Sequence, residues 1–252
     1  MTVCEQKASL RRLMKKRMLE QKAPNLSPFF LESLRDFAPY RNAASVLLYA
    51  SLPHEACTDD FIKLCLADNK ITAIPKICTE QKAKQPVRQI PQPKTKNTFM
   101  DFFILSPSIP LEAQTTPGVF GIREPSDLCI RFNPEKAALP LLVCVPGLAF
   151  GEDGTRLGRG GGYYDTYCAY LKSLAGGLLT DGFAPSAVKR PAEIGKKNTD
   201  KTIFEPECRG QKIVYAGLCR NFQILRTVPS ESHDLRVDYL FCEQGIRAAQ
   251  AL

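Results

Sequence analysis

Apolar residues recur every three or four positions in several parts of the chain, which is the pattern of helices with one buried face. In the first such part, Leu10, Leu13, Met14 and Met18 share a helical repeat among basic side chains. Ser27 and Thr58 suit the N-cap positions of two later helices, because their hydroxyls can accept from free backbone N–H groups. The pattern predicts helices over residues 6–21, 26–37, 59–69 and about 162–174.

Short continuous apolar runs alternate with these helices, and such runs are typical of strands buried on both faces. Strands that alternate with helices favour a parallel sheet covered on both sides. We therefore expect an α/β fold, a three-layer sandwich with a mostly parallel central sheet flanked by helices. The predicted strands are residues 44–50, 71–75, 138–147, 212–218 and 236–242.

Length and composition agree with one globular domain spanning residues 1–252, since hydrophobic residues make up 44% and charged residues 24% of the chain. No apolar run approaches the roughly 20 residues that cross a bilayer, so we expect no membrane partner. The amino-terminal segment lacks the apolar core of a secretory signal. We expect a cytoplasmic monomer, and the basic, amphipathic character of this segment leaves a mitochondrial location open.

The formal net charge of +8 raises the question of nucleic-acid binding. Residues 82–98 contribute +5 and residues 185–212 contribute +3, which together account for the whole excess. Both stretches are rich in proline and lysine and have no periodicity, so we interpret 82–98 and 176–211 as loop insertions. Basic stretches without interleaved aromatic residues do not favour stacking on bases, and we expect no nucleic-acid partner.

The chain has 10 cysteines, but none of them form a C-x-x-C pair, which argues against a zinc knuckle. Cys144 and Cys219 lie inside apolar runs and are typical of small buried residues in a reducing compartment. A nucleophilic cysteine needs a histidine partner, and only His54 and His233 are available. Cysteine–histidine catalysis is therefore disfavoured.

The stretch "RLGRGGGYYD" at residues 156–165 connects the strand at 138–147 to the helix that follows. Ligands of parallel α/β sheets bind at the carboxyl ends of strands, near the N-termini of helices. Glycines let backbone N–H groups converge on an anion, and Arg156 and Arg159 supply paired donors for phosphate. Asp165 is either a magnesium ligand or a residue that caps the helix. The alternative for the whole stretch is a solvated turn, and it contains neither a Walker A nor a G-x-G-x-x-G pattern.

Residues 145–171, "VPGLAFGEDGTRLGRGGGYYDTYCAYL", closely resemble the signature of the 5-formyltetrahydrofolate cyclo-ligase family. Further segments resemble the family in the same order: 7–12, 48–62, 73–77, 121–125 and 232–241. The resemblance implies that ATP drives 5-formyltetrahydrofolate to 5,10-methenyltetrahydrofolate, with release of ADP and phosphate. In that reaction the formyl oxygen is phosphorylated, N10 attacks the activated carbon, and phosphate leaves. ATP and Mg²⁺ are the cofactors that it implies.

The resemblance also assigns site residues, position by position. Catalytic roles fall to Lys7, Arg159 and Tyr163, and magnesium binding to Asp165 and Asp234. ATP would contact Lys7, Arg11, Arg156, Leu157, Gly158, Arg159, Gly160, Gly161, Gly162, Tyr163 and Tyr164. The folate would contact Ala50, Glu55, Arg159, Gly160, Gly161, Gly162 and Tyr163. Spacing alone places Lys7 and Arg11 on one helix face, and without the resemblance this pattern favours a solvated basic surface.

Three other interpretations remain open at this point. The chain can be a homologue that binds folate or nucleotide without turnover, a basic RNA-binding protein, or a phosphosugar enzyme on a similar fold. The basic insertions have two open interpretations: they contact a polyglutamate tail of the substrate, which is polyanionic, or they are simply disordered.

Overall fold

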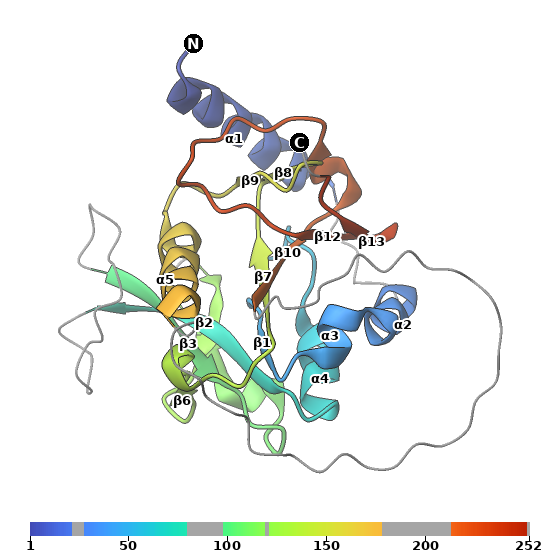
Figure 1. Ribbon diagram of the computed structural model, residues 1–252, viewed down its shortest axis with the longest axis vertical. Coiled ribbons are helices and arrows are strands. Elements are labelled where there is room, and N and C mark those ends of the chain that lie inside the picture. The colour runs from blue at the N-terminus through green and yellow to red at the C-terminus, as the bar shows by residue number, and fades with distance from the viewer. Residues whose placement is uncertain (22–27, 80–97, 119–120, 178–212, 251–252) are drawn as a thin grey trace.

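The computed structural model describes residues 1–21, 28–79, 98–118, 121–177 and 213–250. Its centre is an eight-stranded sheet in the order β13-β12-β10-β7-β1-β2-β3-β6 (Figure 1). The expected N-cap Ser27 and most of the two predicted insertions lie outside the described residues. Of the insertion at 82–98, only Thr98 is described, and it begins a strand; of the insertion at 176–211, only residues 176–177 are described, and they end a helix. The strands of this sheet are β1 (Ser45–Leu47), β2 (Ile71–Thr79), β3 (Thr98–Ile104), β6 (Ile130–Arg131), β7 (Leu141–Pro146), β10 (Ile213–Leu218), β12 (Tyr239–Cys242) and β13 (Gly245–Ala248).

The middle of the sheet is parallel and both edges are antiparallel. Neighbouring strands from β12 through β10, β7 and β1 to β2 run parallel. At one edge β13 pairs antiparallel with β12, and at the other β3 pairs antiparallel with β2 and β6. The mostly parallel sheet predicted from the sequence is therefore confirmed, and the antiparallel edges are additions to it.

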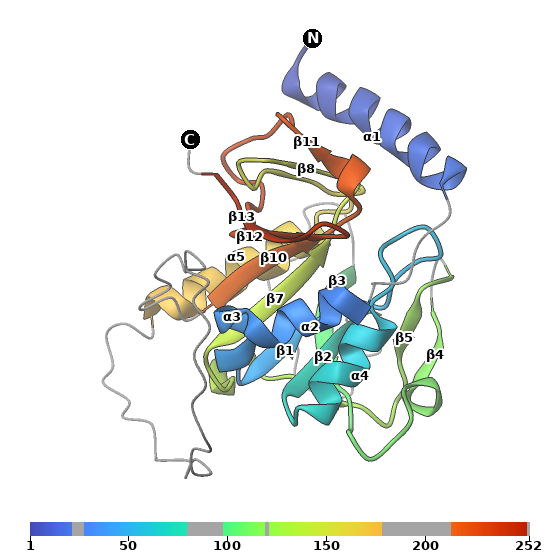
Figure 2. The same ribbon diagram turned by 90° about the vertical axis from the view of Figure 1, so that its right-hand side faces the viewer.

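Alternate residues of the central strands face two separate cores. In β7, Leu142 and Cys144 belong to one hydrophobic cluster, whereas Val143 and Val145 belong to the other. The first cluster is covered by α2 (Pro28–Asp36), α3 (Ala38–Asn42) and α4 (Asp59–Ala67), and the second by α5 (Tyr163–Gly177). Figures 1 and 2 show these helices on opposite faces of the sheet, which is the expected three-layer arrangement.

The amino-terminal helix α1 (Val3–Glu20) covers a separate small sheet (Figure 2). Met14 and Met18 are buried against this sheet, whereas Leu13, expected on the same face, is 49% exposed. Thr2 begins the helix with a capping box, in which its hydroxyl accepts from the Glu5 backbone. The small sheet, in the order β11-β8-β9, consists of β11 (Ile224–Leu225), β8 (Ala149–Gly151) and β9 (Arg156–Leu157).

The remaining elements form short connections, one of which borders the site. The hairpin of β4 (Thr115–Pro117) and β5 (Arg123–Pro125) lies against β2. Thr58 precedes α4 as expected, but its hydroxyl donates to the Tyr49 carbonyl at 2.5 Å and does not cap the helix. The 3₁₀ turns are η2 (Leu111–Gln114), η4 (Pro134–Lys136) and η5 (Asn221–Gln223).

The apolar cysteines behave as expected. Cys144 and Cys219 are buried, and burial raises the pKa of both thiols well above the ordinary value. A high pKa keeps a thiol protonated and unreactive at neutral pH. Among the described residues, no helix has the length and apolar character needed to cross a membrane.

Candidate active site

A cavity of about 740 Å³ opens beside the carboxyl ends of β1 and β7, between α1 and the start of α5. Every site residue expected from the sequence lines it. The first group comes from the amino-terminal half and the second from the glycine loop onward: Lys7, Arg11, Ala50 and Glu55, then Arg156, Leu157, Gly158, Arg159, Gly160, Gly161, Gly162, Tyr163, Tyr164, Asp165 and Asp234. The structure thus brings together residues that are more than 200 positions apart in the sequence.

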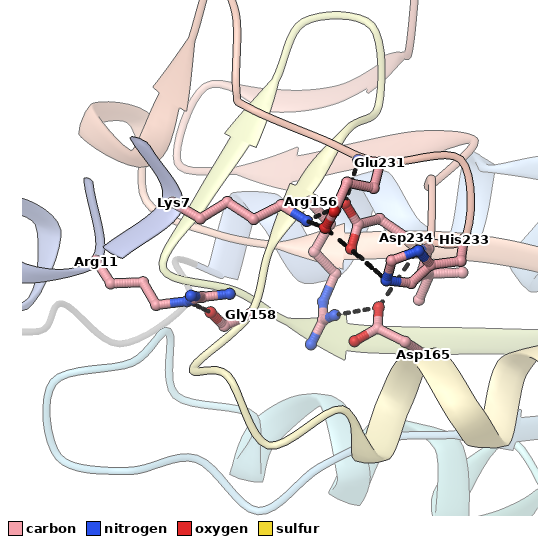
Figure 3. Close-up of polar contacts among 9 residues, drawn as sticks. Lys7, Arg11, Arg156, Gly158, Asp165, Glu231, His233 and Asp234 are labelled. Atoms are coloured by element: carbon pink, nitrogen blue, oxygen red, sulfur yellow. Dashed lines mark hydrogen bonds and ion pairs between the residues drawn. The ribbon is translucent and has the colours of Figure 1, made fainter. Parts of the chain in front are cut away.

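The glycine loop, residues 158–162, turns the chain from β9 into α5. Gly160 and Gly162 have backbone φ angles of +97° and +73°, which residues other than glycine rarely adopt. Arg11 Nε donates to the Gly158 carbonyl at 3.0 Å, and this hydrogen bond connects α1 to the loop (Figure 3). The loop leads directly into Tyr163, the first residue of α5, and the N-terminus of a helix favours a bound anion.

Arg156 is buried and ties the loop to its surroundings. Its Nε donates to the Pro146 carbonyl at 2.8 Å, and its Nη1 donates to Asp165 Oδ1 at 3.1 Å. The guanidinium also stacks over the Tyr164 ring at 5.3 Å. Asp165 Oδ1 additionally accepts from the Leu235 backbone at 3.2 Å. Arg156 therefore joins the end of β7 to α5, and Asp165 extends the network to the segment that carries Asp234.

Lys7 makes two ion pairs at the polar end of the cavity. Its Nζ lies 2.6 Å from Glu231 Oε2 and 2.6 Å from Asp234 Oδ2, and the lysine side chain is only 7% exposed (Figure 3). Asp234 Oδ2 also accepts from the Glu231 backbone at 2.6 Å. Burial alone would lower the pKa of Lys7, but the hydrogen bonds and charges of the two carboxylates raise it overall.

The same contacts act on Asp234 in the opposite sense. Burial favours its neutral form, but the hydrogen bonds from Lys7 and the Glu231 backbone outweigh burial and lower its pKa. Lys7 and Asp234 are therefore a charged pair at neutral pH, and two negative side chains share a single lysine.

A cation could be held by Glu231, His233 and Asp234, whose ligand atoms lie within 4.8 Å of one another. Two carboxylates and an imidazole are suitable donors for a divalent cation. Asp165 is outside this group, and its Oδ1 is occupied by Arg156 and Leu235. The assignment of Asp165 and Asp234 to magnesium stays a prediction. Glu231 was not expected, because "SESHD" gives no sign that its chain folds back onto Lys7.

Arg159 and Glu55 connect the glycine loop to the segment after β1. Arg159 Nη2 and Nε donate to Glu55 Oε1 at 2.8 and 3.2 Å, and Glu55 Oε2 accepts from the Leu52 backbone at 3.1 Å. The Glu55 side chain is 8% exposed, whereas that of Arg159 is 43% exposed. Both oxygens of Glu55 are thus engaged within the protein, while the arginine remains accessible from the cavity.

Two tyrosines on the cavity wall differ in their hydrogen bonding. The Tyr163 hydroxyl lies 2.9 Å from the Thr98 hydroxyl. The Tyr49 hydroxyl is fully buried, and no hydrogen-bond partner for it occurs within the part of the chain that the structure describes. Burial raises the pKa of Tyr49 well above its ordinary value, and the negative charge of Glu55 is the next largest cause of this increase. This hydroxyl is therefore a neutral, uncompensated polar group beside the cavity.

Together, the three-layer fold and the cavity define an α/β protein with a basic, glycine-lined ligand site at the carboxyl ends of parallel strands. Residues 3–177 match the family model of 5-formyltetrahydrofolate cyclo-ligases. The chain therefore belongs to the 5-formyltetrahydrofolate cyclo-ligase family, which confirms the resemblance seen in its sequence.

Individual relatives agree with this assignment. The 5-formyltetrahydrofolate cyclo-ligase of Mus musculus is 30% identical over 130 residues, which are 51% of this chain and 55% of the mouse protein, so that match spans about half of the relative. The cyclo-ligase of Saccharomyces cerevisiae is 24% identical over 218 residues, 85% of this chain and 82% of the yeast protein. The NMR structure of Aquifex aeolicus 5,10-methenyltetrahydrofolate synthetase covers 97% of this chain and 93% of its own, with a TM-score of 0.60 and 21% identity, which shows the shared fold.

Proposed function

We propose that the protein converts 5-formyltetrahydrofolate to 5,10-methenyltetrahydrofolate in a reaction that consumes ATP and requires Mg²⁺. The observation that carries the proposal is that one continuous cavity has basic and glycine residues at one end and a largely apolar wall at the other. A nucleoside triphosphate and a folate can therefore bind side by side in one cavity, as a phosphoryl transfer between them requires.

The polar end suits the phosphates of ATP. Lys7 and Arg11 face the glycine loop from α1, and the loop opens onto the N-terminus of α5. The helix dipole and the cationic side chains both favour negative charge at this position. The loop from Arg156 to Tyr164 then binds the nucleotide, with Arg156 chiefly holding the loop in place.

Magnesium suits the acidic edge of the same end. Asp234 would hold the ion, with Glu231 as a neighbour and Asp165 as the second acid on α5. When bound, Mg²⁺ neutralises charge on the phosphoryl group that is transferred. Lys7, which shares these carboxylates, lies at the boundary between the acidic residues and the loop and can contact a phosphate oxygen.

Arg159 and Tyr163 lie between the two ends and are the proposed catalytic residues beside Lys7. Arg159 uses two of its five N–H donors on Glu55, which positions the guanidinium and leaves donors for the ligand. The terminal phosphoryl group of ATP passes to the formyl oxygen, N10 attacks the activated carbon, and phosphate leaves. Because the reacting groups belong to the substrates, the protein's contribution is positioning and charge stabilisation.

The test is an absorbance assay of the purified protein with 5-formyltetrahydrofolate, ATP and Mg²⁺. We expect the absorbance of the methenyl product to rise only when all three are present, with one ADP released per product. Binding of 5-formyltetrahydrofolate without any turnover would instead identify a non-catalytic homologue. Absence of folate binding, with retention of RNA or turnover of a phosphosugar, would support one of the other interpretations.

A further inference from the structure

The end of the cavity away from Lys7 has an apolar wall that the site residues named so far do not account for. Pro75 and Ile77 of β2, Met100 of β3 and Ile122 of the β4–β5 hairpin line this part of the cavity. Such a wall favours a flat, partly apolar ring system, because burial of its faces removes apolar surface from water.

One buried acid, Glu124 of β5, interrupts this apolar wall. Glu124 lines the cavity and is only 9% exposed. Its side chain fills the space left by Gly118, where a Cβ atom would lie 2.3 Å from Glu124 Cδ. No hydrogen bond or ion pair to its carboxylate is found in the described segments 1–21, 28–79, 98–118, 121–177 and 213–250.

The other charged groups near this wall have partners of their own. Lys76 Nζ donates to the Pro125 carbonyl at 3.1 Å and to Asp127 Oδ1 at 3.2 Å. Both oxygens of Glu55 are engaged by Arg159 and the Leu52 backbone. Among the described residues, Glu124 is thus the buried acid of the cavity wall whose carboxylate has no protein partner, so both of its oxygens are open to a ligand.

A buried carboxylate without partners is best satisfied by two N–H donors on one edge of a ligand, because parallel charge-assisted hydrogen bonds are strong and directional. The pterin ring of a reduced folate carries such an edge, formed by its 2-amino group and the adjacent ring N–H. We propose that Glu124 binds this edge and selects for the pterin. This inference rests on the proposed function, since it names a specificity residue for the same substrate.

The experiment is a calorimetric titration with 5-formyltetrahydrofolate and with its 2-desamino analogue, in the presence of Mg²⁺ and a non-hydrolysable ATP analogue. Wild-type protein should bind the parent compound roughly 10- to 100-fold more tightly than the analogue, as expected for loss of one charge-assisted hydrogen bond. Glu124→Gln should weaken binding of the parent by a similar factor and lose most of the discrimination. The matched control is Glu112→Gln, an exposed acid outside the cavity, which should behave as wild type.

Equal discrimination by wild type and Glu124→Gln would overturn the proposal. If the variant does not fold, absence of discrimination in the wild type overturns it equally, whereas a 10-fold or larger preference supports it. Failure of the proposed function looks different: a protein that does not act on folates would bind neither compound, and a non-catalytic homologue would keep the discrimination in this titration but show no turnover in the absorbance assay. A merely structural role for Glu124 would change the affinities for both compounds, and for the ATP analogue, by the same factor.

Discussion

Lys7 Nζ lies 2.6 Å from the carboxylate of Asp234, although the two residues are 227 positions apart in the chain. Glu231 binds the same lysine from the other side. The pair joins α1 to the segment before β12, and it lies at the acidic edge where we place magnesium. Lys7 therefore neutralises, within the protein itself, the carboxylates that a divalent cation would neutralise.

The first prediction concerns the pH dependence of folding. The pKa of Asp234 is lowered below its ordinary 3.8, so its pairing stabilises the fold above pH 3.8 and this contribution is lost as the pH falls through the lowered value. The raised pKa of Lys7 gives the converse behaviour, with stability present below pH 10.5 and lost as the pH rises beyond it. Lys7→Met should remove the alkaline limb and reduce the acid limb, which the Glu231 backbone hydrogen bond to Asp234 also supports, as measured by urea unfolding between about pH 2 and pH 7 and at alkaline pH.

Lys16→Met is the matched control for this series, because Lys16 lies on the same helix and makes only an exposed pair with Glu20 at 3.9 Å. We expect its pH profile to follow that of the wild type. Parallel profiles for the wild type and Lys7→Met would show that the lysine does not contribute to the pH dependence of folding.

The second prediction concerns Gly160, which has a φ angle of +97° and also lines the cavity. Gly160→Ala should destabilise the protein by about 1–2 kcal/mol through backbone strain and lower kcat/KM for ATP by at least about 10-fold. Gly245, with φ of +113° and no atom within 4 Å of an added Cβ, lies outside the cavity. Gly245→Ala should show the loss of stability alone, as measured by thermal unfolding and initial rates. Equal rates for the two variants would contradict a phosphate-binding role for the loop.

The third prediction separates two roles for Asp165. Asp165→Ala should leave the fold intact and reduce turnover by at least about 100-fold, because positioning of the metal is lost. Asp165→Asn keeps an acceptor for Arg156 and the Leu235 backbone but removes the charge. If the acid serves magnesium, the asparagine variant should be nearly as slow as the alanine variant and require more Mg²⁺. A near-normal rate for Asp165→Asn would show that Asp165 acts by holding Arg156.

The fourth prediction concerns the buried hydroxyl of Tyr49. A buried polar group without a partner costs about 1–3 kcal/mol, so Tyr49→Phe should raise the free energy of unfolding by about 1 kcal/mol or more in the absence of ligand. Tyr40→Phe is the control, since the Tyr40 hydroxyl donates to Asp68 at 2.7 Å and its removal should lower stability. Urea unfolding of both variants tests the contrast. A loss of stability in Tyr49→Phe would show that its hydroxyl is satisfied.

Prediction from the sequence succeeded where the signal was local. The central strands are uninterrupted apolar runs, and α5 follows a glycine loop whose residue types describe its geometry. The strand β3 was not predicted, because Asp101 interrupts its apolar pattern. Asp101 is fully buried and forms an ion pair with Arg131 of the neighbouring β6, a partner that no short window of sequence can reveal.

The candidate site shows the same division. The glycine loop and its arginines are contiguous in the sequence, so their convergence on one cavity could be expected. Glu231 and Glu124 could not be assigned, because each owes its position to a fold-back of the chain. Glu231 meets Lys7 across 224 positions, and Glu124 reaches the cavity only because the β4–β5 hairpin lies against β2.

The pairing of α1 with the segment at 231–234 also has a consequence for biosynthesis. Lys7 leaves the ribosome 227 residues before Asp234, so the acidic edge cannot assemble until the segment at 231–234 has been synthesised. A nascent chain that ends before residue 213 contains the glycine loop but lacks β10, β12 and both acidic partners of Lys7. Nucleotide binding, and any protection that it gives against proteolysis, should therefore begin only after residue 234 has left the ribosome.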